Sequence, residues 1–322
     1  MHPIRVGIVG TGYAAKARAE SLQFDPRSQL VAIAGGRNWS ATQQFAASYG
    51  AEAVIHWSNL IDRDLDLILI ANLNGEHSKI VRAALAADKH VVVEYPLAID
   101  YTEAIELAQL AQCQNRLLHV EHIELLSGIH QAVKLALPEL GIPFYSRYTS
   151  LNSQHPAPHK WTYSLPQFGF PLIGAVSRIH RLTDLFGAVT TVHCQARFWQ
   201  RDAEFYHSCL CTAQFKFASG LVAELTYGKG EAIWQSLRAL EIHGEHGAIF
   251  VNGDQGQLVN LTETRSLNLG TRRGLFAKDT ASVLDYLTVG APLYVSLDAS
   301  LSALQVADAA RRSAESGQPI HL

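Results

Sequence analysis

Residues 4–17 read Ile-Arg-Val-Gly-Ile-Val-Gly-Thr-Gly-Tyr-Ala-Ala-Lys-Ala, and this stretch decides the fold. Residues 4–9 form an apolar run that is typical of a buried strand. Gly10, Gly12 and Ala15 follow at the spacing G-x-G-x-x-A and lead into a helical pattern over residues 13–24. The first glycine permits a tight turn, the second lets a pyrophosphate approach the backbone, and the small third residue lets helix and strand pack closely. The stretch therefore predicts a dinucleotide-binding turn with the phosphates at the helix N-terminus.

Beyond this turn, strand-like and helical runs alternate as far as residue 121. The run Asp66–Ala71 (DLILIA) is typical of a fully buried strand, and Asp100 with Glu103 forms a capping box for the helix that follows. This alternation predicts βαβ units and a parallel sheet. We therefore expect an α/β Rossmann domain, which binds NAD(P), over residues 1–121.

After residue 121 the pattern changes to longer alternating segments, with helical patterns only at residues 124–137, 171–186 and 299–316. Ser219-Gly220 separates two such segments and predicts a hairpin turn. Residues 122–322 are therefore expected to form an α+β substrate-binding domain with a large, mostly antiparallel open sheet. The last helix is free to pack back toward the N-terminal domain. A long connection rich in proline and aromatic residues, 153–171, is expected to be functional.

The residues after the second expected strand bear on the choice between NAD and NADP. An acidic residue there binds the ribose 2′-hydroxyl of NAD, whereas an arginine accommodates a 2′-phosphate. The chain reads Ala34-Gly35-Gly36-Arg37-Asn38, which contains no acid. Arg37 therefore favours NADPH, with NADH used less well. The alternative is that Arg37 is a solvated loop residue and that both cofactors are used.

Composition excludes several classes of function. The 322 residues carry a formal net charge of −3, which predicts no nucleic-acid partner, and no apolar run is long enough to span a membrane. The N-terminus has no signal-peptide pattern, and the four cysteines form no C-x-x-C pair. We expect a cytoplasmic protein with reduced thiols and no metal site.

Several segments resemble the Gfo/Idh/MocA oxidoreductase family. Residues 71–77 (ANLNGEH) and 86–94 (AADKHVVVE) are similar to the stretch that leads to the family's E-K-P motif, and Glu94-Tyr95-Pro96 occupies the motif itself. Trp161 resembles the tryptophan that family members place near the nicotinamide. The resemblance covers essentially the whole chain and implies an NAD(P)H-dependent oxidoreductase.

The departures from the family pattern are informative. In the family's sugar and polyol dehydrogenases, the lysine of the motif works with an aspartate and a histidine on a helix of the second domain to move a proton. Here Tyr95 replaces the lysine. On the matching helix, expected over residues 171–186, the histidine would fall at or beside Ser177 and Arg178, and His180 is out of phase. The machinery that oxidises alcohols therefore looks absent.

The same substitutions resemble a narrower group, the biliverdin reductases of cyanobacteria. Residues 94–97 (EYPL), 119–126 (HVEHIELL), 168–172 (FGFPL) and 177–187 carry this similarity. It implies NADPH-dependent reduction of biliverdin IXα to bilirubin by hydride transfer to the C10 methine bridge. Biliverdin, a linear tetrapyrrole, would need an aromatic slot, cations for two propionates and stabilisation of developing charge.

Two residues are the catalytic candidates. Arg178 would orient the bilin and stabilise charge, because a guanidinium with a pKa above about 12 is a poor proton donor. Tyr95 either donates a proton or shapes the pocket. The alternative for Arg178 and Arg181 is that both pair with acids such as Asp184.

The remaining site residues are expected to bind substrate or cofactor. The substrate-binding candidates are Arg181, His122, Trp161 and Phe170. The cofactor-binding candidates are Gly10, Thr11, Gly12, Tyr13, Ala14, Gly36, Arg37, Asn38, Ala71, Asn72, His77, Glu94, Tyr95 and Trp161.

Two other functions stay open from the residues alone. One is a dehydrogenase or reductase of a sugar, polyol or other small carbonyl, against which Tyr95 and the displaced histidine argue. The other is a catalytically silent NADP(H)-binding regulatory protein. Either a monomer or a homodimer is compatible with the sequence.

Overall fold

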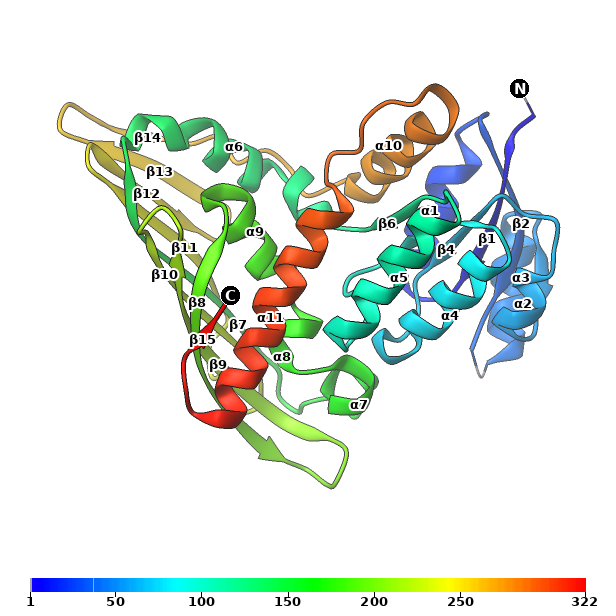
Figure 1. Ribbon diagram of the computed structural model, residues 1–322, viewed down its shortest axis with the longest axis horizontal. Coiled ribbons are helices and arrows are strands. Elements are labelled where there is room, and N and C mark those ends of the chain that lie inside the picture. The colour runs from blue at the N-terminus through cyan, green and yellow to red at the C-terminus, as the bar shows by residue number, and fades with distance from the viewer. Residues whose placement is uncertain (1, 37) are drawn as a thin grey trace. The chain divides into compact units, whose positions relative to one another are not determined.

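The computed structural model describes residues 2–36 and 38–322. The chain divides into two compact units. The first comprises Met1–Ile123 with Gly274–Leu301, and the second comprises Glu124–Arg273 with Ser302–Leu322. Each unit has its own sheet (Figure 1).

The first unit is built on a six-stranded parallel sheet of order β3-β2-β1-β4-β5-β6. Chain order reverses between β1 and β4, which creates the crevice where dinucleotides bind in such sheets. The strands are β1 (Ile4–Val9), β2 (Ser28–Ala34), β3 (Glu52–Val54), β4 (Leu67–Ile70), β5 (His90–Val93) and β6 (Leu118–Val120). The helices that join them are α1 (Tyr13–Gln23), α2 (Trp39–Ser48), α3 (Trp57–Ile61), α4 (Asn74–Ala86) and α5 (Tyr101–Cys113). The predicted Rossmann fold is confirmed.

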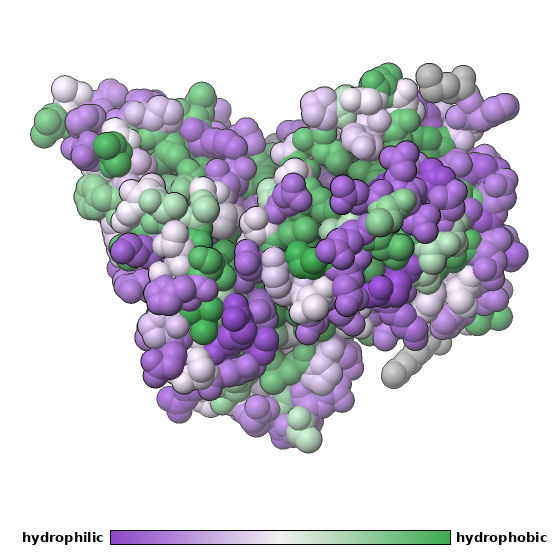
Figure 2. All heavy atoms as spheres, viewed as in Figure 1, coloured by the Kyte–Doolittle hydropathy of each residue, from purple (hydrophilic) through white to green (hydrophobic). Residues whose placement is uncertain are grey.

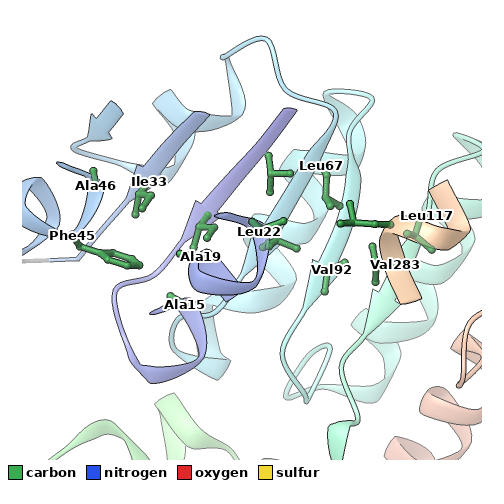
Figure 3. Close-up of a cluster of buried hydrophobic side chains, with 14 residues drawn as sticks. Ala15, Ala19, Leu22, Ile33, Phe45, Ala46, Leu67, Val92, Leu117 and Val283 are labelled. Carbon is green, nitrogen blue, oxygen red and sulfur yellow. The ribbon is translucent and has the colours of Figure 1, made fainter. Parts of the chain in front are cut away.

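Apolar side chains from α1, α2 and the sheet form the core of this unit (Figure 3). Ala15 and Ala19 lie on the buried side of α1 and are fully covered. Their small side chains let the helix approach the sheet closely, as the G-x-G-x-x-A spacing requires. Asp100 accepts hydrogen bonds from Thr102 N and Glu103 N and caps α5, so the predicted helix start is correct.

A helix from late in the chain completes this core. Helix α10 (Leu275–Val289) packs beside α1 and contributes Val283 and Leu284 to the cluster (Figures 1 and 3). This helix was not predicted from the sequence, because its buried side includes Asp279 and Thr280, which interrupt the apolar periodicity.

The second unit is built on a nine-stranded sheet of order β14-β13-β12-β11-β7-β10-β9-β8-β15. All neighbouring pairs are antiparallel except β7 and β10, so the predicted, mostly antiparallel sheet is confirmed. The strands are β7 (Pro143–Ser153), β8 (Val189–Gln200), β9 (Tyr206–Phe217), β10 (Val222–Gly230), β11 (Leu237–Gly244), β12 (Gly247–Asn252), β13 (Gln255–Asn260), β14 (Thr264–Ser266) and β15 (Ile320–His321). Gly220, with φ +92°, forms the predicted turn between β9 and β10.

One face of this sheet is covered by helices (Figure 1). They include α6 (Gly128–Ala136), α9 (Ser177–Phe186) and the end of α11 (Leu297–Ser316), where Ser313 Oγ accepts from Cys194 N. The expected single helix over residues 171–186 is wrong, because α8 (Pro171–Gly174) and α9 are separate. The chain leaves the helical path after Gly174, whose missing side chain makes room for the Phe168 ring: a Cβ there would lie 2.4 Å from it.

Among the described residues, no helix is long and apolar enough to cross a membrane. In the view of Figure 2, the side of the first unit that faces the reader is mostly hydrophilic over α4 and α5. This is the pattern of helices that cover a sheet on one side and face water on the other.

Candidate functional site

The turn between β1 and α1 fits a pyrophosphate. Gly10 has φ +126°, and a Cβ on it would lie 2.2 Å from the carbonyl oxygen of Ala71. Only glycine therefore lets the end of β1 pass this close to the end of β4. A Cβ on Gly12 would meet nothing within 4 Å, so space is open directly in front of the α1 N-terminus. Backbone N–H groups at such a helix end attract phosphate oxygens.

Gly12 offers a clean test of this fit. Its φ of −77° is ordinary for alanine, so Gly12→Ala should fold normally and fill only the space that the phosphates need. We expect the Kd for NADP⁺ to rise at least about tenfold, because the methyl group would keep the pyrophosphate from the backbone. Titration calorimetry measures the Kd. An unchanged Kd, with an unchanged melting temperature, would show that no phosphate lies over Gly12.

Some of the other cofactor candidates have structural roles in the loops around this turn. Asn38 accepts a hydrogen bond from Ala41 N and caps α2, and Arg37 lies outside the described residues. The His77 ring is fully buried, with Nδ1 2.8 Å from the Pro96 carbonyl oxygen and Nε2 3.4 Å from that of Asn72. Burial lowers the pKa of His77, so a neutral imidazole links the loops after β4 and β5. Its position supports these loops rather than opening onto solvent.

The remaining cofactor candidates lie around the same turn. Thr11 and Ala14 are half-buried, while Tyr13 is 82% exposed and meets the ring of Phe276 edge-on at 6.0 Å. A Cβ on Gly36 would also meet open space.

A buried ionic network crosses the first unit. The Arg18 guanidinium, 1% exposed, donates to Glu94 Oε1 and to Asp279 Oδ2, each at 2.7 Å. Asp279 Oδ1 accepts from Tyr294 at 2.7 Å and lies 2.8 Å from His119 Nε2. Glu94, a cofactor candidate and the chain neighbour of Tyr95, is thereby held in place by contacts with α1 and α10.

Glu121 lies in the same network. Burial, with Glu94 and Asp279 close by, raises its pKa well above the ordinary value. Its carboxyl oxygen Oε1 accepts a hydrogen bond from the backbone N–H of Ile123. The raised pKa favours the uncharged form of Glu121, which limits the negative charge that Arg18 must balance.

Tyr95 and His122 stack in parallel. Their ring centroids are 5.8 Å apart with an interplanar angle of 8°. His122 is buried, and its backbone N–H donates to the Tyr294 hydroxyl at 3.0 Å. The half-buried Tyr95 therefore has a fixed ring plane set by a residue of the same network.

In the second unit, Arg178 lines a cavity of about 380 Å³. It lies at the start of α9, with Nη1 2.9 Å from Ser177 Oγ and its guanidinium carbon 5.9 Å from the centre of the Tyr227 ring. The lining residues are Ser150, Leu151, Asn152, Arg178, Tyr227, Ser236, Leu237 and Arg238.

Arg181 has a different setting from Arg178. It is 3% exposed, donates to Glu124 Oε2 at 2.9 Å and lies over the Tyr148 ring. Arg272 pairs with the same carboxylate. The alternative of pairing with an acid therefore holds for Arg181, although the acid is Glu124, while Asp184 binds His130 and Lys134.

Arg238 was missed by sequence reasoning. It lines the cavity and lies near Arg178 and Arg272, and burial first, then these two cations, lower its pKa. Burial would raise the pKa of Glu124, but the four nearby arginines, 181, 272, 178 and 238, lower it. This side of the cavity therefore carries net positive charge. The signal was available: Arg238 is in phase with the inward-facing Leu240 and Ile242 of β11.

The aromatic connection folds against the same sheet face. Trp161 is half-buried, and its ring centre lies 5.9 Å from that of Phe168. Phe170 is 9% exposed and is the N-cap residue of α8, and its ring is largely buried. Phe168 rather than Phe170 is the neighbour of Trp161.

Two family models match the chain. The model described as an oxidoreductase family with an NAD-binding Rossmann fold matches residues 4–122, and that of the oxidoreductase C-terminal alpha/beta domain matches residues 136–322. The chain belongs to the Gfo/Idh/MocA oxidoreductase family.

Two relatives narrow the comparison. The crystal structure of the biliverdin reductase from Synechocystis sp. PCC 6803, in complex with biliverdin and NADP⁺, is 50% identical, covers 97% of this chain and 99% of its own, and has a TM-score of 0.95. Biliverdin reductase A of Mus musculus is 25% identical over 85% of this chain and 82% of its own. An NAD-binding oxidoreductase structure from Klebsiella pneumoniae, 19% identical with a TM-score of 0.85, shares the fold.

Other residues stand at the positions where the resemblance would put the lysine and histidine of the family's alcohol-oxidising members. Tyr95 replaces the motif lysine, and α9 presents Arg178 to the cavity. His180, on the same helix, is 2% exposed and does not line the cavity, and burial lowers its pKa to about 4. It therefore stays neutral at physiological pH and is not placed to carry a proton there.

Proposed function

We propose that this oxidoreductase reduces biliverdin IXα to bilirubin with NADPH. One observation carries the proposal: a cavity is lined by two arginines and a tyrosine, and one of them, Arg178, is at or beside the position where the resemblance would put the histidine of the family's dehydrogenases. The 50% identity to a reductase whose structure holds biliverdin and NADP⁺ supports it. When bound, NADPH supplies the hydride that adds to the C10 methine bridge.

Arg178 and Arg238 are assigned to the substrate. Two guanidinium groups suit carboxylates such as propionates, because each offers paired N–H donors in a planar fork. Arg178 also lies against the Tyr227 ring, which restricts its orientation. We assign it to orienting the bilin and stabilising the negative charge that develops as the conjugated system is reduced. Arg181 is already paired with Glu124, a carboxylate that also lies near Arg178 and Arg238.

The cofactor is assigned to residues 1–121 and the substrate to residues 122–322. Gly10 and Gly12 would admit the pyrophosphate, and Arg37 would favour the 2′-phosphate of NADPH over NADH. Trp161 is assigned to ligand binding, as the family resemblance implies.

Tyr95 has two compatible roles, which one variant separates. Its ring is held by stacking on His122 in either case. Tyr95→Phe keeps the ring and removes only the hydroxyl. A large loss of kcat would assign the proton to Tyr95, and near-normal kcat would leave it a shaping role.

The test of the function is spectroscopic. Purified protein is mixed with biliverdin IXα and NADPH, and we expect the long-wavelength biliverdin band to fall as a bilirubin band grows, with matching NADPH oxidation. NADH should be used less well, and Arg37→Ala should narrow that difference. No spectral change between acidic and neutral pH, with NADPH shown to bind, would refute the proposal.

A further inference from the structure

Lys229 is an unusual lysine because it is almost completely buried. It is 6% exposed and lies near the end of β10, two residues after Tyr227 and therefore on the same face of the strand. Tyr227 lines the cavity with Arg178. Lys229 thus lies immediately beside the proposed substrate site without lining it.

Aromatic rings surround its ammonium group. Lys229 Nζ is 3.8 Å from the centre of the Phe168 ring, 4.8 Å from that of Tyr163 and 5.5 Å from that of Tyr206. Ring faces attract a cation through their quadrupoles, most strongly where water is excluded. Its hydrogen bond goes to the backbone carbonyl oxygen of Thr162. No carboxylate among residues 2–36 and 38–322 forms a salt bridge with it.

These contacts join both ends of one segment. Thr162 stands between Trp161 and Tyr163, and its carbonyl oxygen also accepts from the Tyr206 hydroxyl at 3.3 Å. Phe168, at the other end, contacts Trp161 and fills the space beside Gly174. The position of Trp161 therefore depends on two groups that Lys229 holds.

We propose that Lys229 is a positioning residue whose ammonium fixes the aromatic segment 161–168 and thereby sets Trp161 for substrate and nicotinamide. The role of Trp161 in binding ligands rests on the proposed function. The claim that the Lys229 ammonium fixes segment 161–168 does not depend on that function, and it can be tested separately.

The buried charge of Lys229 lowers the stability of the fold. A positioning role can therefore be distinguished from a stabilising one. Burying an unpaired ammonium is unfavourable, and methionine in the same space would avoid that cost. Burial first, with nearby Lys160 and Arg178, lowers the pKa of Lys229 to about 8. The unfolded chain then binds more protons between pH 8 and the ordinary value of 10.5, so this group makes the fold more stable as pH rises through that interval.

The thiols and phenols that lie near the ammonium lose their protons only at higher pH, because burial raises the pKa of each. Burial raises the pKa of Cys209 to about 11 and of Tyr163 to about 12, and it raises those of Cys211 and Tyr206. Lys160 and Arg178 are the neighbouring cations. A transition near pH 8 in this segment therefore reports Lys229.

The experiment compares Lys229→Met with Lys216→Met, a control at an exposed position of β9. The reporter is the Trp161 fluorescence, obtained as the difference between each protein and its Trp161→Phe derivative, followed from pH 6 to 10. We expect the parent chain and the control to show a transition near pH 8 and Lys229→Met to show none. A transition that persists in Lys229→Met, or that is absent from the parent, overturns the proposal.

Kinetics and stability complete the test. Lys229→Met should raise the KM for biliverdin about tenfold with a smaller change in kcat, since a displaced segment weakens orientation. Its melting temperature should equal or exceed that of the parent chain. A lower melting temperature with unchanged KM would make Lys229 a purely structural residue. If neither the parent chain nor any variant reduces biliverdin, the proposed function is wrong. The fluorescence experiment would still test the positioning role of Lys229.

Discussion

Replacing Arg178 with alanine is expected to lower kcat/KM for biliverdin by about 100- to 1000-fold, the usual effect of removing a preorganised group that stabilises developing charge. Arg178 lines the cavity, and the Tyr227 ring and Ser177 restrict its orientation. Without it, the cavity loses a planar donor fork at the substrate. Steady-state kinetics with NADPH in excess measures the loss.

Two further variants make this result specific. Arg178→Lys keeps the charge and loses the fork, so it should recover only part of the activity. Arg197→Ala, at an exposed arginine of β8, should react like the parent chain. Full activity in Arg178→Ala would show that Arg178 does not act on the substrate and that the cavity it lines is not the substrate site.

Replacing Asp279 with asparagine should destabilise the protein by about 3 kcal/mol or more, because it breaks a buried ion pair and weakens the hydrogen bonds that Arg18 and Tyr294 donate to the carboxylate. Arg18 is 1% exposed and would keep only Glu94 as a charged partner. Asparagine has almost the same shape, so packing is preserved. Guanidinium unfolding curves measure the effect, and hydrogen exchange in residues 13–23 locates it.

The pH dependence of the stability difference between the parent chain and Asp279→Asn provides a second test. Burial would raise the pKa of Asp279, but Arg18 and His119 lower it well below the ordinary value of 3.8. The contribution of a carboxylate with a lowered pKa is fully present above its ordinary value and is lost as pH falls further. The difference between the parent and Asp279→Asn should therefore be constant from pH 5 to 7 and shrink below about pH 4. Asp62→Asn, at an exposed acid of the same unit, should change stability little at any pH.

Sequence motifs predicted those parts of the fold that depend on interactions between residues close together in the chain. The turn at Gly10–Gly12 and the cap at Asp100 depend on neighbours within a few residues, so their motifs predicted them. Helix α10 depends on a charge partner 261 residues away, and its buried Asp279 removes the apolar signal on which such predictions rest. The break after Gly174 lies beside the Phe168 ring, a side-chain contact that no capping or turn motif announces.

The candidate site divides in the same way. Arg178 and Tyr95 could be predicted because they replace residues at recognisable motif positions. Arg238 and Lys229 belong to no motif, and only the sheet places them beside Tyr227. A polar residue in phase with inward apolar neighbours of a strand was the one signal that could have identified them.

The position of α10 in the chain sets an order of events during synthesis. Residues 124–273 interrupt the first unit, so Asp279 and Tyr294 leave the ribosome long after Arg18 and His119. Until then the nascent nucleotide-binding half holds a guanidinium and an imidazole without the carboxylate that joins them. The second unit can complete its central strands in this interval, although its own last segment, Ser302–Leu322, arrives only at the end of synthesis. The first unit, which is begun first, therefore closes only after most of the second unit has been translated.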